Sequence, residues 1–164
     1  AIREQLDALD KLGIAHEVVP GVSSFLAAAA AMQKEYTLPE VTQTVILTRM
    51  EGRTPVPERE RIEELAKHRA TMVIFLSVGR IAELAERLKT AYPETTPVAV
   101  VYKASWPDET IVTGTLADIA EKVQAAGITK TALVTIGDFL GDSYALSKLY
   151  DKAFTHEYRQ GKNA

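Results

Sequence analysis

The stretch VVPGVSSF, residues 18–25, leads directly into a leucine and a run of five alanines. Its two valines favour the end of a strand, Pro20 lacks a backbone donor, and Gly21 permits a turn that other residues resist. Ser23 or Ser24 is suited to cap the following helix with a side-chain oxygen. The pattern predicts strand, tight turn and helix, with free N–H groups in the first helical turn that suit an anionic ligand. The same residues also fit an ordinary strand-to-helix connection.

Length and composition set the class of protein. With 164 residues, 46% of them hydrophobic, the chain can bury one core, so one globular domain is expected. It lacks cysteine and its three histidines are scattered, so we expect neither disulfides nor a metal site. A net charge of −3 with interspersed signs argues against binding to nucleic acid, and no apolar run reaches the roughly 20 residues that span a membrane. A cytoplasmic protein is expected.

The amino terminus begins inside a helical pattern, with Ile2, Leu6, Leu9 and Leu12 on one stripe and Gly13 suited to end the helix. There is no initiator methionine, and no charged segment followed by an apolar one as in a signal peptide. We interpret this start as a truncation.

Apolar runs then alternate with amphipathic helical patterns. The expected strands are residues 15–19, 44–48, 72–77, 97–102, 110–113 and 131–136. Further helices are expected at 23–34, 58–68, 81–88 and 115–127. The runs at 73–76 and 98–101 lack polar alternation, as strands buried on both faces do. The predicted fold class is therefore α/β, with a mixed sheet of five to six strands and helices on both faces.

Two loops at predicted strand ends carry unusual chemistry. Residues 49–57 hold two arginines, two prolines and a glycine, which indicates either a restricted ligand-binding loop or a solvated connection. Residues 103–109 place the single tryptophan, Trp106, beside a proline, a lysine and two carboxylates. Its indole is either a stiff wall of a binding site or a core side chain. The later segment 148–156 mixes aromatic and cationic residues, and we interpret it as a tail docked on the surface.

Several segments resemble the tetrapyrrole methylase family, and within it the branch acting on precorrin-4 or cobalt-precorrin-4. They are VVPGVSSF, TQTVILTRMEGRTPVPE (42–58), LAKHRATMVIFLS (65–77), VVYKASWPDE (100–109) and SKLYDKAFTH (147–156). The resemblance implies transfer of a methyl group from S-adenosylmethionine to carbon 11 of the corrin precursor in cobalamin biosynthesis, with S-adenosylhomocysteine as the product.

The same resemblance implies two α/β domains around a cofactor cleft. Residues 14–164 resemble the second domain, and residues 1–13 resemble the end of the helix that joins the two. An amino-terminal methylase domain is then expected as a partner, together with a second copy in a homodimer and a tetrapyrrole as the small-molecule substrate.

The resemblance also carries site residues onto this chain. The implied cofactor-binding residues are Ser23, Ser24, Leu76, Ser77, Ala104 and Gly137. In α/β folds ligands settle at the carboxyl ends of strands, so Ser23, Ser77, Ala104 and Gly137 are expected to form one cleft rim. The candidates for the acidic side chains of the substrate are Arg49, Arg53 and Lys103.

No catalytic base is singled out. Because a sulfonium donor is already activated, the protein mainly supplies proximity, orientation and exclusion of water. The competing hypothesis is an α/β domain that serves association only and leaves its cleft unused.

Overall fold

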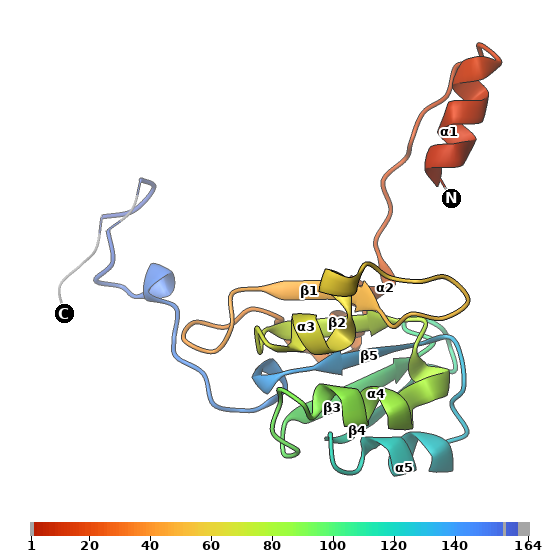
Figure 1. Ribbon diagram of the computed structural model, residues 1–164. Coiled ribbons are helices and arrows are strands. Elements are labelled where there is room, and N and C mark those ends of the chain that lie inside the picture. The colour runs from red at the N-terminus through yellow and green to blue at the C-terminus, as the bar shows by residue number, and fades with distance from the viewer. Residues whose placement is uncertain (1, 156, 161–164) are drawn as a thin grey trace.

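A five-stranded mixed sheet forms the centre of the computed structural model, which describes residues 2–155 and 157–160 (Figure 1). The strands are β1 (Val45–Arg49), β2 (Thr71–Phe75), β3 (Pro97–Tyr102), β4 (Thr110–Thr115) and β5 (Ala132–Ile136). Their order is β1-β2-β5-β3-β4; β1 and β2 are parallel, and the other neighbouring pairs are antiparallel. The predicted mixed sheet is confirmed.

The direction of β5 decides which loops meet. Strands β1, β2 and β3 run the same way, so their carboxyl ends share one edge, whereas β5 runs oppositely between β2 and β3. Its last residue, Ile136, pairs with Met72 near the start of β2. Gly137 therefore lies at the opposite edge from Ser77 and Ala104, and the prediction that it shares their cleft rim is wrong. Residues that follow two strands lie at the same end of the sheet only when the two strands run in the same direction.

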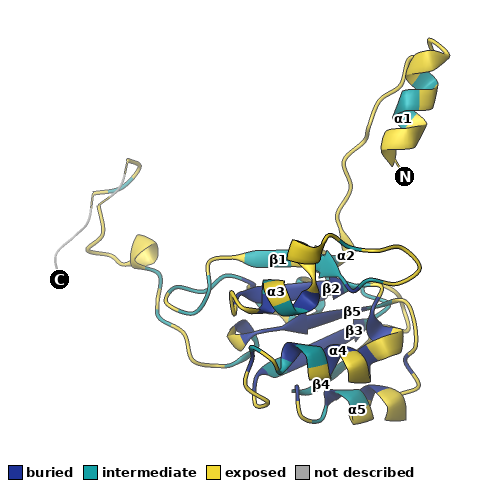
Figure 2. Cartoon of the chain, viewed as in Figure 1, coloured by how far each residue is buried: buried dark blue, intermediate teal, exposed yellow. Residues whose placement is uncertain are grey.

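Helices cover both faces of the sheet, as predicted. On one face lie α3 (Ile62–Ala66), α4 (Ile81–Leu88) and α5 (Ile119–Ala125), and on the other lies α2 (Ser24–Met32). The α3–α5 face packs on alternate strand side chains such as Ile74 and Val100, while α2 packs on Val73 and its neighbours. Figure 2 shows the burial concentrated in the sheet between these layers.

The predicted helix at 58–68 is divided. A 3-10 turn covers Glu58–Glu60, Arg61 is extended, and α3 follows. Only Ile62 and Ala66 are buried in this segment, so packing holds the second part alone in an α-helix. Further 3-10 turns lie at Val78–Arg80, Asp138–Leu140 and Lys148–Tyr150.

The amino-terminal segment differs from its prediction. Helix α1 (Ile2–Lys11) forms as expected and is followed by Gly13 at φ +65°. Residues 14–22 are extended but join no strand, and Val18 and Val19 are 56% and 76% exposed. The predicted strand at 15–19 is therefore wrong, because β-branched residues favour a strand only where a neighbouring strand and a half-buried surface are available. In Figure 1, α1 stands clear of the sheet.

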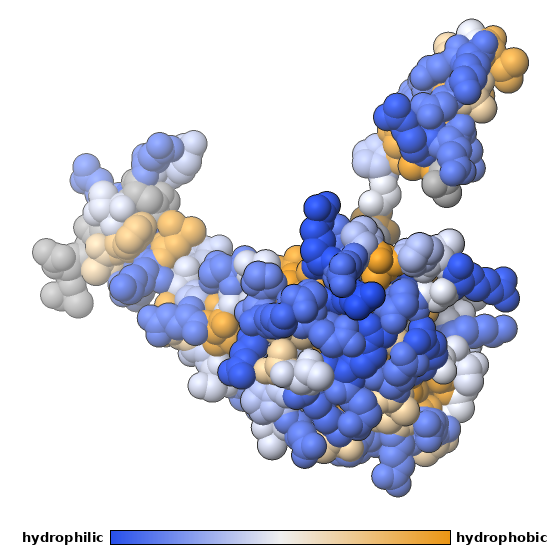
Figure 3. Space-filling view, viewed as in Figure 1, coloured by the Kyte–Doolittle hydropathy of each residue, from blue (hydrophilic) through white to orange (hydrophobic). Residues whose placement is uncertain are grey.

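The carboxyl-terminal tail packs mainly on itself. The Arg159 guanidinium donates to the carbonyls of Leu149, Asp151 and Phe154, and Tyr150 remains 79% exposed. The prediction of a surface-docked tail is wrong for its described part, since Figure 1 shows it leading away from the sheet; residue 156 lies outside the described residues. In Figure 3, apolar residues are visible at the margins of α1 and on this tail, whereas the face over α3–α5 is mainly hydrophilic.

Candidate functional site

A groove of about 550 Å³ lies at the edge where β2 and β3 end. Its apolar lining comes from strand residues and the residues that follow them: Phe75, Leu76, Val101, Ala104, Trp106 and Leu133. Ser24, at the start of α2, adds a hydroxyl, and three cations line the groove, Arg80, Lys103 and Lys130. An apolar concavity with a few polar groups is the usual form of a small-molecule site.

The residues that follow β2 and β3 both adopt a left-handed backbone. Leu76 has φ +55° and Lys103 has φ +48°, and residues other than glycine rarely adopt such backbone angles. Leu76 is also 89% exposed at the groove. Strained backbone of this kind gathers at ligand-binding sites, where the surrounding fold holds it in place. The assignment of Leu76 as an apolar wall remains a prediction, and its position at the groove suits that role.

Lys103 and Trp106 form one wall of the groove. The Lys103 ammonium pairs with the Asp108 carboxylate and lies 5.1 Å from the ring centroid of Tyr102 and 5.4 Å from that of Trp106. The hydrogen bond to Asp108 raises the pKa of Lys103, which therefore stays cationic. Trp106 is 57% exposed, so its interpretation as a core side chain is wrong.

The start of α2 is open. Ser23 occupies the N-cap position but makes no side-chain capping bond, so the predicted cap is wrong. Its carbonyl accepts the N–H groups of Leu26 at 3.0 Å and Ala27 at 3.3 Å. Among the described residues, neither the Ser23 nor the Ser24 hydroxyl has a hydrogen-bond partner. Both hydroxyls are thus available to a ligand, and Ser24 lines the groove.

Ser77 has a different place. Its side chain is buried, and its hydroxyl donates to the Phe75 carbonyl at 2.8 Å and accepts the Met50 N–H at 3.1 Å. It ties the loop after β1 to the end of β2. Of the six predicted cofactor-binding residues, the structure therefore brings Ser24, Leu76 and Ala104 together at the groove, with Ser23 beside them in the chain.

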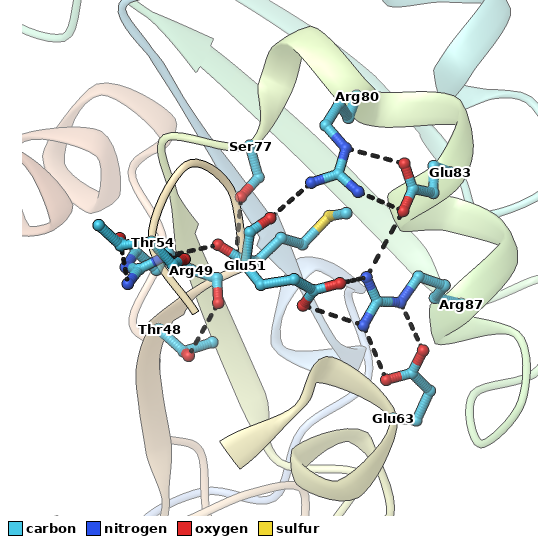
Figure 4. Close-up of polar contacts among 10 residues, drawn as sticks. Thr48, Arg49, Glu51, Thr54, Glu63, Ser77, Arg80, Glu83 and Arg87 are labelled. Atoms are coloured by element: carbon cyan, nitrogen blue, oxygen red, sulfur yellow. Dashed lines mark hydrogen bonds and ion pairs between the residues drawn. The ribbon is translucent and has the colours of Figure 1, made fainter. Parts of the chain in front are cut away.

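A second pocket, of about 670 Å³, lies between the loop after β1 and helices α3 and α4. In its lining, Arg87 donates to the carboxylates of Glu51 and Glu63, with Nη2 at 3.2 Å from Glu51 Oε2 and 3.0 Å from Glu63 Oε2 (Figure 4). Hydrogen bonds from Arg87 lower the pKa values of both carboxyls. Arg80 donates to Glu83 at 2.8 Å and to the Glu51 carbonyl at 2.5 Å. Sequence reasoning missed this network.

The two arginines of the loop do different things. The Arg49 guanidinium donates to the Met50, Thr54 and Pro55 carbonyls and to the Thr54 hydroxyl, at 3.0–3.3 Å, so it holds its own loop together. Arg53 lies at the tip of a turn closed by the Gly52 N–H and the Thr54 carbonyl at 3.1 Å. It is exposed, and within the described residues it has no hydrogen bond or ion pair.

The described residues contain no group of carboxylates and histidines that would hold a metal ion, and no helix long and apolar enough to cross a membrane.

Residues 1–120 match the model of the tetrapyrrole (corrin/porphyrin) methylases. The chain belongs to the tetrapyrrole methylase family. It is 59% identical over 162 residues to the cobalt-precorrin-4 C(11)-methyltransferase of Methanocaldococcus jannaschii, covering 98% of this chain and 62% of that protein.

Other tetrapyrrole methylases agree with this match. The precorrin-4 C(11)-methyltransferase of Pseudomonas aeruginosa is 47% identical, over 99% of this chain and 65% of its own. A solved cobalt-precorrin-4 methyltransferase superposes with a TM-score of 0.83 at 48% identity, over 87% of this chain and 60% of its own. The structure of a Thermus thermophilus uroporphyrin-III C-methyltransferase in complex with S-adenosylhomocysteine superposes with a TM-score of 0.67 at 25% identity. This match covers 84% of this chain and 59% of that protein. The chain thus spans about three fifths of the length of these relatives.

Proposed function

We propose that this chain is the donor-side part of an S-adenosylmethionine-dependent methyltransferase that methylates carbon 11 of precorrin-4 or cobalt-precorrin-4 in cobalamin biosynthesis. The relatives named for that reaction match nearly the whole chain. The observation that carries the proposal is the groove at the ends of β2 and β3, where Ser24, Leu76 and Ala104 meet.

The groove fits the proposed donor in size and chemistry. Its volume of about 550 Å³ lies within the range of small-molecule sites. Phe75, Leu76 and Val101 offer an apolar surface to an adenine ring, while the Ser23 and Ser24 hydroxyls are available for polar contacts. S-adenosylmethionine brings a methyl group already activated on sulfur, so this chain needs to bind and orient it.

The acceptor is proposed to bind next to this groove through cations. Arg53 has free donors, and a guanidinium binds a carboxylate through two parallel hydrogen bonds. Lys103 lies at the groove but already pairs with Asp108, and Arg49 is engaged by its own loop. Of the three predicted substrate-binding residues, Arg53 is thus the best placed to receive a new anion.

We further propose that a second α/β domain completes the cleft, and that the enzyme is a cytoplasmic homodimer. The relatives extend well beyond the matched region, which leaves room for such a domain. Apolar residues of the amino-terminal segment also need a cover, since Leu12 is 73% and Val22 81% exposed.

Calorimetric titration with S-adenosylhomocysteine tests the donor assignment. We expect saturable binding, reduced about 10-fold in Leu76→Ala because an apolar contact is lost. Leu146→Ala, which removes a leucine of similar exposure that does not line the groove, is the matched control and should bind as the parent does. If the parent chain does not bind S-adenosylhomocysteine, the donor assignment fails and the association-domain alternative is favoured.

A further inference from the structure

Arg53 lines the pocket beside the loop after β1, and the function proposed so far gives the rest of that pocket no role. We infer that it is a subsite for a carboxylate arm of the acceptor, with Arg53 as the binding residue and the Glu51–Arg87 pair as its positioning device. The inference rests on the proposed function for the identity of the acceptor. The subsite itself rests on the charges and contacts of this loop.

Three carboxylates and three arginines line the pocket, so its lining charges balance, but one of the arginines has no partner. Three carboxylates line it, and each already faces a cation: Glu51 and Glu63 bind Arg87, and both oxygens of Glu64 lie 2.7 Å from the Lys67 ammonium. Among the described residues, Arg53 is the lining cation without any partner. A carboxylate entering the pocket at the Arg53 side therefore meets a guanidinium without a partner, while Glu51 and Glu63 on the opposite wall share the charge of Arg87.

A second arginine of the pocket, Arg61, is only weakly paired. Arg61 also lines the pocket, and its contact with the Glu58 carboxylate is long, at 3.9 Å. Both side chains of that pair are more than half exposed, so the pair is weak and leaves Arg61 able to turn toward an anion. The expected ligand is thus an anionic group small enough for the pocket, such as an acetate or propionate arm of a tetrapyrrole.

The loop is held in the shape that presents Arg53. Arg87 fixes the Glu51 carboxylate, and Arg80 fixes the Glu51 carbonyl at 2.5 Å, directly before the turn that carries Arg53 (Figure 4). On the other side of the tip, Arg49 fixes Thr54. A loop already ordered in its binding shape loses less entropy when the ligand arrives.

The subsite adjoins the donor groove. Arg80 lines that groove and also holds the Glu51 carbonyl, and Ser77 ties the start of the loop to the end of β2. The loop therefore stands at the sheet edge where the groove lies. This placement suits a macrocycle whose ring reaches the methyl donor while one acidic arm is held to the side.

A double-mutant cycle tests both roles. The probe is uroporphyrin, a porphyrin polycarboxylate, whose binding to the chain is followed by fluorescence. We expect Arg53→Ala to weaken its binding roughly 10- to 100-fold, and Arg53→Lys to weaken it less. Glu51→Gln should also weaken it, but should add nothing in the Arg53→Ala background, because Glu51 acts through Arg53. Arg59→Ala, which removes an exposed arginine outside the pocket, is the control.

The outcomes separate the subsite from the proposed function. Uroporphyrin that does not bind the parent chain, or binds Arg53→Ala as tightly, overturns the subsite. Independent, additive losses in the cycle overturn the positioning role of Glu51. The affinity for S-adenosylhomocysteine should be the same in Arg53→Ala and in the parent chain. If the parent chain does not bind S-adenosylhomocysteine, that result counts against the donor assignment and not against the subsite.

Discussion

Among single residues, Ser77 joins the loop after β1 to the end of β2 through its one hydroxyl. We expect Ser77→Ala to lower the free energy of unfolding by about 1–3 kcal/mol, because the Met50 N–H would be left buried and unpaired. Urea denaturation measures this change. Ser143→Ala, at an exposed serine, should leave the stability as it is. Equal stability of Ser77→Ala and the parent chain would mean that water replaces the lost bond.

The candidate site could be predicted only where a residue's place follows from the strand before it. Leu76 and Ala104 lie close behind the carboxyl ends of β2 and β3, so their meeting at one groove follows once those strands are recognised. The inward hydroxyl of Ser77 and the loop contacts of Arg49 depend on backbone groups whose position no local pattern reveals. Gly137 was misplaced because the direction of its strand depends on distant pairing.

The ion-pair network between the loop and α4 predicts an acid-sensitive element. Hydrogen bonds from Arg87 hold the pKa values of Glu51 and Glu63 below their ordinary value of 4.5. Their contribution to stability is present above that value and is lost as pH falls through the lowered folded-state values. We therefore expect the thermal unfolding midpoint to decrease as the pH is lowered below 4.5.

The matched variant is Arg87→Met, which keeps the apolar stem and removes the charge. Its stability should be lower at pH 7, and it should lose less on acidification than the parent chain, since the two carboxyl pKa values return toward normal. Thermal unfolding followed by circular dichroism across this pH range measures both. Parallel pH profiles for the two proteins would show that the network adds no acid sensitivity.

Helix α2 packs closely on the sheet through small side chains. Ala28 is fully buried against the cluster that includes Val73 and Phe139. We expect Ala28→Leu to cost about 1–3 kcal/mol of stability, because added methyl groups must displace packed neighbours. Ala30→Leu is the control, because it makes the same substitution on the exposed side of the same helix. It should leave the stability nearly unchanged. Similar denaturation midpoints for the two variants would contradict this packing.

The elements could be predicted where a pattern and its packing partner coincide. Strands β2, β3 and β5 were expected because their apolar runs are long enough to fill a buried sheet. Residues 15–19 have the same local preference for a strand, yet they lie away from any sheet edge. Propensity alone does not decide between the two cases, since a strand is stabilised by its neighbours.

For the whole molecule, association is the main expectation. Apolar side chains remain uncovered on α1, on the segment after it and on the tail, including Ile2 at 57% and Leu146 at 81% exposed. We expect sedimentation at micromolar concentration to show a homodimer, because burial of such surface favours association. A monomer throughout that range would contradict the expectation. Dilution to nanomolar concentration gives the control for reversibility.

The central place of β5 has a consequence for how the chain is made. It follows the other four strands in the sequence, yet it lies between β2 and β3. A growing chain can pair β1 with β2 and β3 with β4, but both pairs keep an open inner edge until residues 132–136 arrive. Open apolar edges invite pairing with other chains. During synthesis, we therefore expect the chain to be most prone to wrong strand pairing in the interval before this last strand emerges.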